Sequence, residues 1–186
     1  MKTKYKYRGF TIIDYHDDNG IDNLRDFIAP SHLHTCAANE HIGDIDRSIR
    51  KIKERVRCGC YSIPYKKFTK LMTISLVQDI ITCLNMFPSK NGVSSNLSPA
   101  EFILGYPNLD YNKLKVTFGA YAQVYKDTTN STKQIMVGYI SLRPTNERGE
   151  YYFMSLAIGK QLHAFIWTEL PIDNQVISRV NNFATK

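Results

Sequence analysis

The feature that most constrains the fold is a series of four short strand-like runs in the C-terminal half of the chain. They span residues 116–125, 134–142, 151–156 and 163–170, and polar or glycine-containing turns separate them. Short strands at this spacing predict a small antiparallel sheet or barrel. Residues 172–183 would follow the last strand as a terminal helix.

The chain before Pro107 has a different sequence pattern, which predicts both helices and strands. We expect strands at 9–17 and 32–37, and helices at 22–29, 44–57, 66–87 and 98–105. The 44–57 helix is predicted from an apolar stripe, whose members are Ile45, Ile49, Ile52 and Val56. This order predicts a βαβα part. The sequence therefore predicts an α/β protein with two domains, 1–107 and 108–186.

The positive charge of the chain is concentrated in one helix. The formal net charge is +7, and the first 43 residues are close to neutral. Six cations fall within the eleven residues 47–57, where Glu54 is the only acid: Arg47, Arg50, Lys51, Lys53, Arg55 and Arg57. Such a patch favours an anionic partner, nucleic acid before a membrane surface. A merely solvated helix face is the alternative.

Two carboxylates are candidate metal ligands. Asp18 lies in Asp-Asn-Gly at the end of the first expected strand, and Asp46 lies where the basic helix begins. Carboxylates bind Mg²⁺ or Mn²⁺ through oxygen, and such ions stabilise the attacking and leaving oxygens in phosphoryl transfer. Each residue also has a structural explanation. Asp-Asn-Gly is a common turn, and an acid in the first turn of a helix is favoured by the helix dipole.

A softer metal site is a further possibility. His32, His34 and Cys36 alternate, so a strand would place all three on one face. Together with Cys58 or Cys60 they would suit zinc, although a polar face on an edge strand explains them as well. No signal peptide precedes the cysteines, which indicates reduced thiols and an intracellular location, in the nucleus or cytoplasm. No apolar run approaches the length of a membrane span, so we expect no membrane association.

Several loose motifs occur in a characteristic order. They are Tyr7-Arg8-Gly9-Phe10, Asp18-Asn19-Gly20-Ile21-Asp22, His41 to Arg50, Pro88 to Gly92, Leu97 to Pro107, Phe118 to Ala122, Gly138-Tyr139-Ile140 and Thr168-Glu169. Together they resemble the integrase region of copia-type LTR retrotransposon polyproteins over about residues 7–173.

The resemblance implies a ribonuclease-H-like core with metal-dependent transfer of element DNA into target DNA. By position, Asp18 corresponds to the second acid of a three-acid magnesium or manganese site, and Asp46 to the third. Arg47, Arg50 and Lys53 correspond to DNA-backbone contacts, and Lys51 and Arg57 are further candidate nucleic-acid-binding residues. The third acid is Glu in the family and Asp here, and the 28 positions from Asp18 to Asp46 are a short interval for the family.

The family's first acid belongs to a strand upstream of Met1. The expected protein is therefore an incomplete ribonuclease-H-like integrase core followed by a small β module, a DNA-binding polyprotein fragment that is inactive alone. A strand transferase completed by a longer polyprotein is the alternative. A protein-interaction module without a nucleic-acid role is another. A sheet without its leading strands exposes an edge, so self-association is expected, or association with other retroelement proteins.

Overall fold

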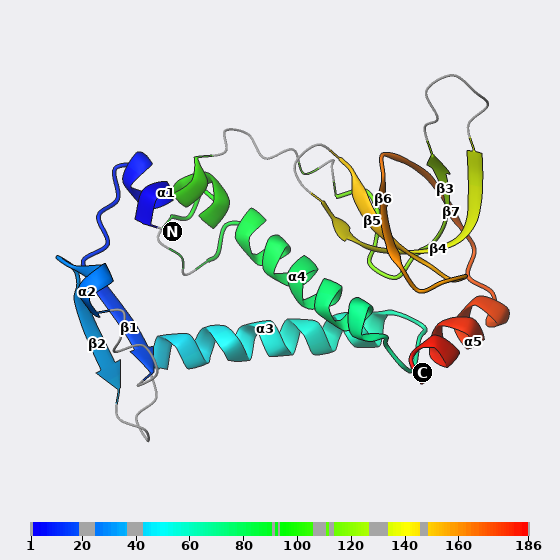
Figure 1. Ribbon diagram of the computed structural model, residues 1–186, viewed down its shortest axis with the longest axis horizontal. Helices are drawn as coiled ribbons and strands as arrows, with labels where there is room; N and C mark the ends of the chain where they lie inside the picture. Colours follow the sequence, from blue (N-terminus) through cyan, green and yellow to red (C-terminus); the bar gives the residue numbers. More distant parts are fainter. Residues whose placement is uncertain are drawn as a thin grey trace. The chain divides into compact units, whose positions relative to one another are not determined.

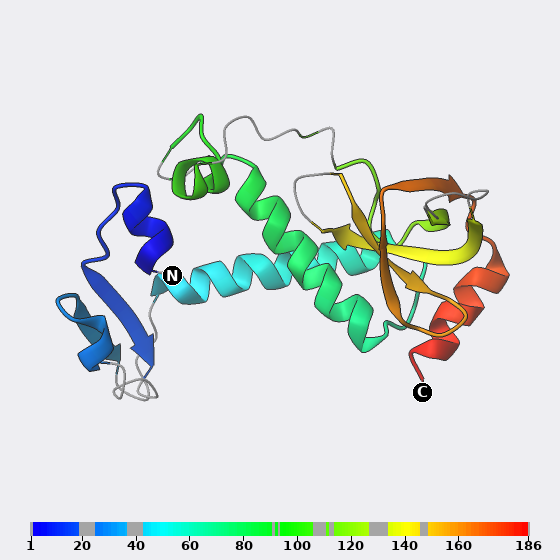
Figure 2. The same cartoon turned by 45° about the horizontal axis from the view of Figure 1, so that its top comes forward.

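The computed structural model describes residues 2–18, 25–36, 43–90, 92, 94–105, 111, 114–126, 134–145 and 149–185. It is a mixed α/β protein, whose helices and strands are shown in Figures 1 and 2. The chain divides into two compact units. The first unit comprises Met1–Lys53 and Asn85–Pro107, and the second comprises Glu54–Leu84 and Asn108–Lys186. The predicted domain border near 107 is also a border between the units, whereas residues 54–84 group with the C-terminal strands.

The first unit contains a parallel strand pair. After helix α1 (Lys2–Tyr7), strands β1 (Asp14–Asp18) and β2 (His32–Cys36) pair in parallel, and the short helix α2 (Arg25–Ile28) lies between them in the chain. The strand expected at 32–37 is confirmed. The strand expected at 9–17 begins only at Asp14, because β2 starts opposite that residue. Of the helix expected at 22–29, residues 25–28 are helical and 22–24 lie outside the described residues.

A short helical segment, η2 (Ala100–Leu104), confirms the helix expected at 98–105. Its start is fixed by a reciprocal pair of hydrogen bonds. The Glu101 backbone N–H donates to Ser98 Oγ at 3.1 Å, and the Ser98 N–H donates to Glu101 Oε2 at 2.8 Å. This capping box satisfies two donors that a helix start leaves without partners. Gly105 ends the segment in the left-handed conformation, with φ of 69°.

The longest helix is α3 (Gly43–Ser62), which continues five residues beyond the expected end at residue 57. Gly59 is tolerated inside it because helix α4 (Lys70–Met86) approaches closely there. A β-carbon added at Gly59 would lie 3.2 Å from Leu76 Cδ1. The helix expected at 66–87 is confirmed as α4, with a start four residues later.

The second unit contains the five-stranded antiparallel sheet, which confirms the expected small antiparallel sheet. Its strands are β3 (Tyr121–Lys126), β4 (Gln134–Pro144), β5 (Tyr151–Ser155), β6 (Gln161–Ala164) and β7 (Ile166–Leu170). Their order is β6-β5-β4-β3-β7, and every neighbouring pair is antiparallel. The run expected at 163–170 is therefore two strands. Only Phe165 separates β6 from β7, although they are the two edges, so the sheet must curve strongly (Figure 1).

The sheet is buried on both faces, each against its own core. One core joins sheet residues to α4 and to the terminal helix α5 (Asn174–Phe183), and it consists of Tyr65, Met72, Leu76, Phe118, Ile140, Leu142, Met154, Leu156, Val176 and Val180. The other core lies on the opposite face and consists of Ala122, Val124, Tyr139, Tyr151, Phe153 and Ala164. Neighbours along a strand point to opposite faces. Accordingly, Phe153 and Met154 belong to different cores.

The loop between α3 and α4 is tied to the sheet and to α5. The Tyr65 hydroxyl donates a buried hydrogen bond of 2.8 Å to the Gly119 carbonyl. The Asn181 side chain on α5 accepts from the backbone N–H groups of Lys66 and Lys67, each at 3.0 Å. These bonds fix the C-terminal end of α3 and the start of α4 against the sheet.

Candidate nucleic-acid interface

The cations predicted to contact DNA lie on the solvent-exposed surface of α3. Arg47, Arg50, Lys51, Lys53 and Arg57 are all exposed. Arg50, Lys53 and Arg57 follow one another at spacings of three and four, so they form a row along one helix face. We call these five residues the α3 cationic face. Arg47 to Lys53 belong to the first unit and Arg57 to the second.

Four of these cations have no carboxylate partner in the part of the chain that the structure describes. No ion pair involves Arg50, Lys51, Lys53 or Arg57 there, although Glu54 lies on the same helix. Their charge is therefore not neutralised locally. A row of exposed cations on a helix is suited to bind the regularly spaced phosphates of a nucleic-acid backbone.

The apolar stripe of α3 is buried over only part of its length. Val56 packs against the core of the second unit, whereas Ile45 and Ile49 are 42% and 43% exposed. The N-terminal half of α3 thus exposes both apolar and cationic side chains. This half also carries Asp46.

The predicted acid pair occupies the expected backbone positions. Asp18 is the last residue of β1, and Asp46 lies in the first turn of α3 with an exposed side chain. The Asp18 side chain lies outside the described part, so its pairing with Asp46 stays a prediction. Among the side chains that the structure does describe, no group of three or more His, Cys, Asp or Glu residues is placed to hold a metal ion.

The histidines of the β1–β2 pair face one another. His34 Nε2 lies 3.1 Å from Asp14 Oδ1, and the His34 ring stacks on His16 with a centroid distance of 5.0 Å. The parallel register explains this contact, because it aligns His16 with His34. Cys36 was the third residue of the possible zinc set, and its side chain lies outside the described part.

The second unit contains one candidate site that was not predicted from the sequence. A cavity of about 280 Å³ separates the end of α3 and α4 from the sheet. Its lining contains three titratable side chains, Asp79 and Cys83 from α4 and Tyr151 from β5. The sequence contains a signal for this site, since Asp79 is the single acid in a mostly apolar helix.

Burial keeps the titratable groups of this cavity in their neutral forms to unusually high pH. Burial raises the pKa of Asp79 to about 6, and the positive charge of Arg143 offsets part of that effect. Burial also raises the pKa of the Cys83 thiol, with a smaller contribution from Asp79. The pKa of Tyr151 is raised for the same main reason. Asp79 is thus the group that titrates closest to neutral pH among these three.

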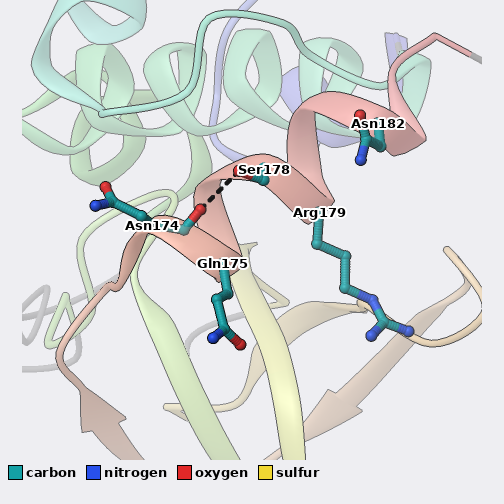
Figure 3. Close-up of a pocket in the computed structure, with 5 residues that line it drawn as sticks. All are labelled: Asn174, Gln175, Ser178, Arg179 and Asn182. Carbon is teal, nitrogen blue, oxygen red and sulfur yellow. Dashed lines mark hydrogen bonds between the residues drawn. The ribbon is translucent and has the colours of Figure 1, made fainter.

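A second hollow runs along α5 (Figure 3). It measures about 570 Å³ and is lined by Asn174, Gln175, Ser178, Arg179 and Asn182. The side chains come from one helix, and Arg179 Nε already donates to the Leu156 carbonyl at 2.7 Å. Ser178 Oγ donates to the Asn174 carbonyl of the same helix at 2.8 Å. Two of the five lining side chains are thus engaged in hydrogen bonds within the protein.

No helix in the described ranges is long and apolar enough to cross a membrane. The chain matches no protein-family model, and it matches no curated protein either.

Proposed function

We propose that this chain is an integrase-like protein that binds nucleic acid, with the α3 cationic face as the contact surface. The observation that carries the proposal is the exposed row of Arg50, Lys53 and Arg57, for which the described part of the chain contains no carboxylate partner. Binding would be electrostatic and largely independent of base sequence, because the row offers charge to phosphates rather than a shaped surface to base edges.

The integrase assignment draws support from the order of elements in the first unit. A parallel strand–helix–strand sequence is followed by a long helix, with Asp18 at the end of β1 and Asp46 in the first turn of α3. The family resemblance implies this placement of the second and third acids. We propose a ribonuclease-H-like core on that basis.

Salt dependence tests the binding proposal directly. If about five phosphates are neutralised, affinity for a random-sequence duplex should fall roughly 10²- to 10³-fold between ~50 and ~200 mM monovalent salt. Fluorescence anisotropy with a labelled duplex measures this slope. A flat response would contradict backbone contact.

Charge reversal locates the surface. Replacing Arg50, Lys53 and Arg57 by Glu should abolish measurable duplex binding. The matched control is the replacement of Lys66, Lys67 and Lys70 by Glu, which makes the same change in net charge at exposed positions elsewhere. Equal losses in both triple variants would mean that only net charge matters. Unchanged binding in the α3 variant would favour the protein-interaction alternative instead.

A second candidate function is metal-dependent DNA strand transfer, which the backbone positions of Asp18 and Asp46 favour. These carboxylates would hold Mg²⁺ or Mn²⁺, and the ion would stabilise the oxygens of the reacting phosphodiester. Calorimetric titration with Mn²⁺ tests it: Asp18→Asn and Asp46→Asn should each weaken Mn²⁺ binding at least about tenfold. Asp173→Asn is a control on the helix α5 cap. Wild-type affinity in both acid variants would overturn the metal role.

A further inference from the structure

The Asp79 carboxylate lacks a hydrogen-bond donor in the described part of the chain. No hydrogen bond or ion pair involves it there. Every fully buried side-chain oxygen and nitrogen that the structure describes does have a partner. The Asp79 oxygens are therefore not sealed in the protein interior. They reach open space, and the open space beside them is the 280 Å³ cavity.

Arg143 carries a positive charge that acts on Asp79 but does not form an ion pair with it. Arg143 influences the Asp79 charge, but its guanidinium is placed over the Tyr152 ring, 4.6 Å from the ring centroid. It also donates from Nη1 to the Pro144 carbonyl at 3.2 Å. Arg143 is thus held by other contacts and forms no ion pair with Asp79.

The rest of the cavity wall is mainly apolar. Its side chains include Leu76, Ile80, Val116, Phe118 and Pro144. A desolvated carboxylate beside an apolar wall is costly unless a cation pairs with it. Small-molecule sites typically combine an apolar wall with a few well-placed polar groups.

The remaining titratable groups add no charge near neutral pH. The pKa values of Cys83 and Tyr151 are both raised, so thiol and phenol stay neutral. The Tyr151 hydroxyl is also near the Val116 N–H, at 3.5 Å. The cavity therefore presents one negative charge when Asp79 is ionised, and the charge of Arg143 lowers the pKa of that carboxyl.

We propose that this cavity binds a small organic cation, an ammonium or amidinium group attached to an apolar body, with the cationic group seated against Asp79. The ligand's N–H donors would satisfy the carboxylate, and its apolar part would cover Leu76, Ile80 and Val116. The cavity lies just below the usual range of about 300–1,000 Å³ for ligand pockets, so the ligand is small. The proposal is independent of nucleic-acid binding at α3.

A matched pair of probes tests the proposal. Phenethylammonium and 2-phenylethanol have similar shapes, but only the first is charged. In an NMR titration of the full chain near pH 7, phenethylammonium should shift the methyl signals of Leu76, Ile80 and Val116, and it should bind about tenfold more tightly than the alcohol. Equal affinity, or shifts confined to other residues, would overturn the proposal.

The Asp79→Asn variant keeps the shape and removes the charge. It should lose the roughly tenfold preference for the ammonium probe, while the weaker binding of the alcohol stays the same. Glu169→Gln is the matched control, because Glu169 is an exposed acid of the same unit outside the cavity lining. Retention of the preference in Asp79→Asn would contradict a seat at this carboxylate.

The pH dependence gives a readout that needs no variant. Since the pKa of Asp79 is about 6, this carboxyl group is protonated in most molecules one pH unit below that value and ionised in most molecules one unit above it. Because the neutral site keeps the weaker, charge-independent binding, affinity for phenethylammonium should rise about fivefold between ~pH 5 and ~pH 7. The alcohol should bind equally at both pH values. A pH-independent ammonium affinity would overturn the proposal even if Asp79→Asn failed to fold.

Discussion

Helices α3 and α4 follow one another in the chain and differ in where their charged side chains lie. α3 carries many charges and keeps the cations of the α3 cationic face in solvent, and even Ile45 and Ile49 are about two-fifths exposed. α4 is mostly apolar, buries Met72 completely, and holds the single acid Asp79 against the sheet. Exposed charges cost the fold little and remain available to a partner. A desolvated charge costs stability, so its presence in a helix is the more informative observation.

The largest expected effect comes from deleting apolar side chains in the two helices. Met72→Ala should lower the free energy of unfolding by about 2–5 kcal/mol, because Met72 is fully buried and its removal leaves a cavity. Ile49→Ala should cost about 1 kcal/mol or less, since that side chain is already 43% exposed. Urea unfolding followed by far-UV circular dichroism measures both. Similar losses in the two variants would remove the contrast between the helices.

Replacing Asp79 should have the next largest effect on the free energy of unfolding, and it should raise that free energy, whereas most substitutions lower it. Its pKa is 3.8 in an ordinary environment and about 6 in the folded protein, so the folded state holds the proton more tightly. The associated stability is fully present below about pH 4 and is lost as the pH rises through about 6. Wild-type stability should therefore decline over this interval.

Asp79→Asn should remove that decline and make the protein about 1–3 kcal/mol more stable than wild type near pH 7. The two proteins should differ little near pH 4. Urea unfolding at several pH values measures the difference, followed by the fluorescence of Trp167, which packs against the core that contains Tyr151 and Phe153. A variant that is less stable than wild type near pH 7 would show that the Asp79 charge is already compensated.

The smallest expected effect belongs to the exposed cations. Arg50→Ala should change the free energy of unfolding by less than about 0.5 kcal/mol, because the side chain is exposed and has no ion-pair partner among the described residues. The same variant should weaken duplex binding and reduce its salt slope by about one. Thermal unfolding together with fluorescence anisotropy checks both. A loss of stability equal to that of Met72→Ala would mean that Arg50 serves the fold.

Periodicity and turn residues predicted much of the fold. Alternation and turn spacing located the antiparallel sheet, and the apolar stripe located α3. The division of residues 163–170 into β6 and β7 was not predicted. Only one residue, Phe165, separates these two strands, and they form opposite edges of the sheet. The extension of α3 past residue 57 was also not predicted. Gly59 lies inside this extension, and its lack of a side chain allows close packing against Leu76, a contact that local sequence does not reveal.

The two candidate sites differ in how well the sequence predicts them. The α3 cationic face depends on residues close together along one helix, so composition and spacing predict it. The Asp79 cavity combines α4 with Val116, Pro144 and Tyr151, which lie far away in the sequence. Burial and hydrogen bonding decide whether that acid is functional, and neither can be read from local pattern.

The pairing of β3 with β7 has a consequence for how the second unit assembles. It joins residues 121–125 to residues 166–170, so the strand that covers this edge of β3 is synthesised last among the strands. Until β7 emerges, the backbone N–H and C=O groups along that edge are open to pairing with another chain. Contacts between such distant residues also slow folding. A nascent chain that stopped before Ile166 would therefore be the species most prone to aggregate.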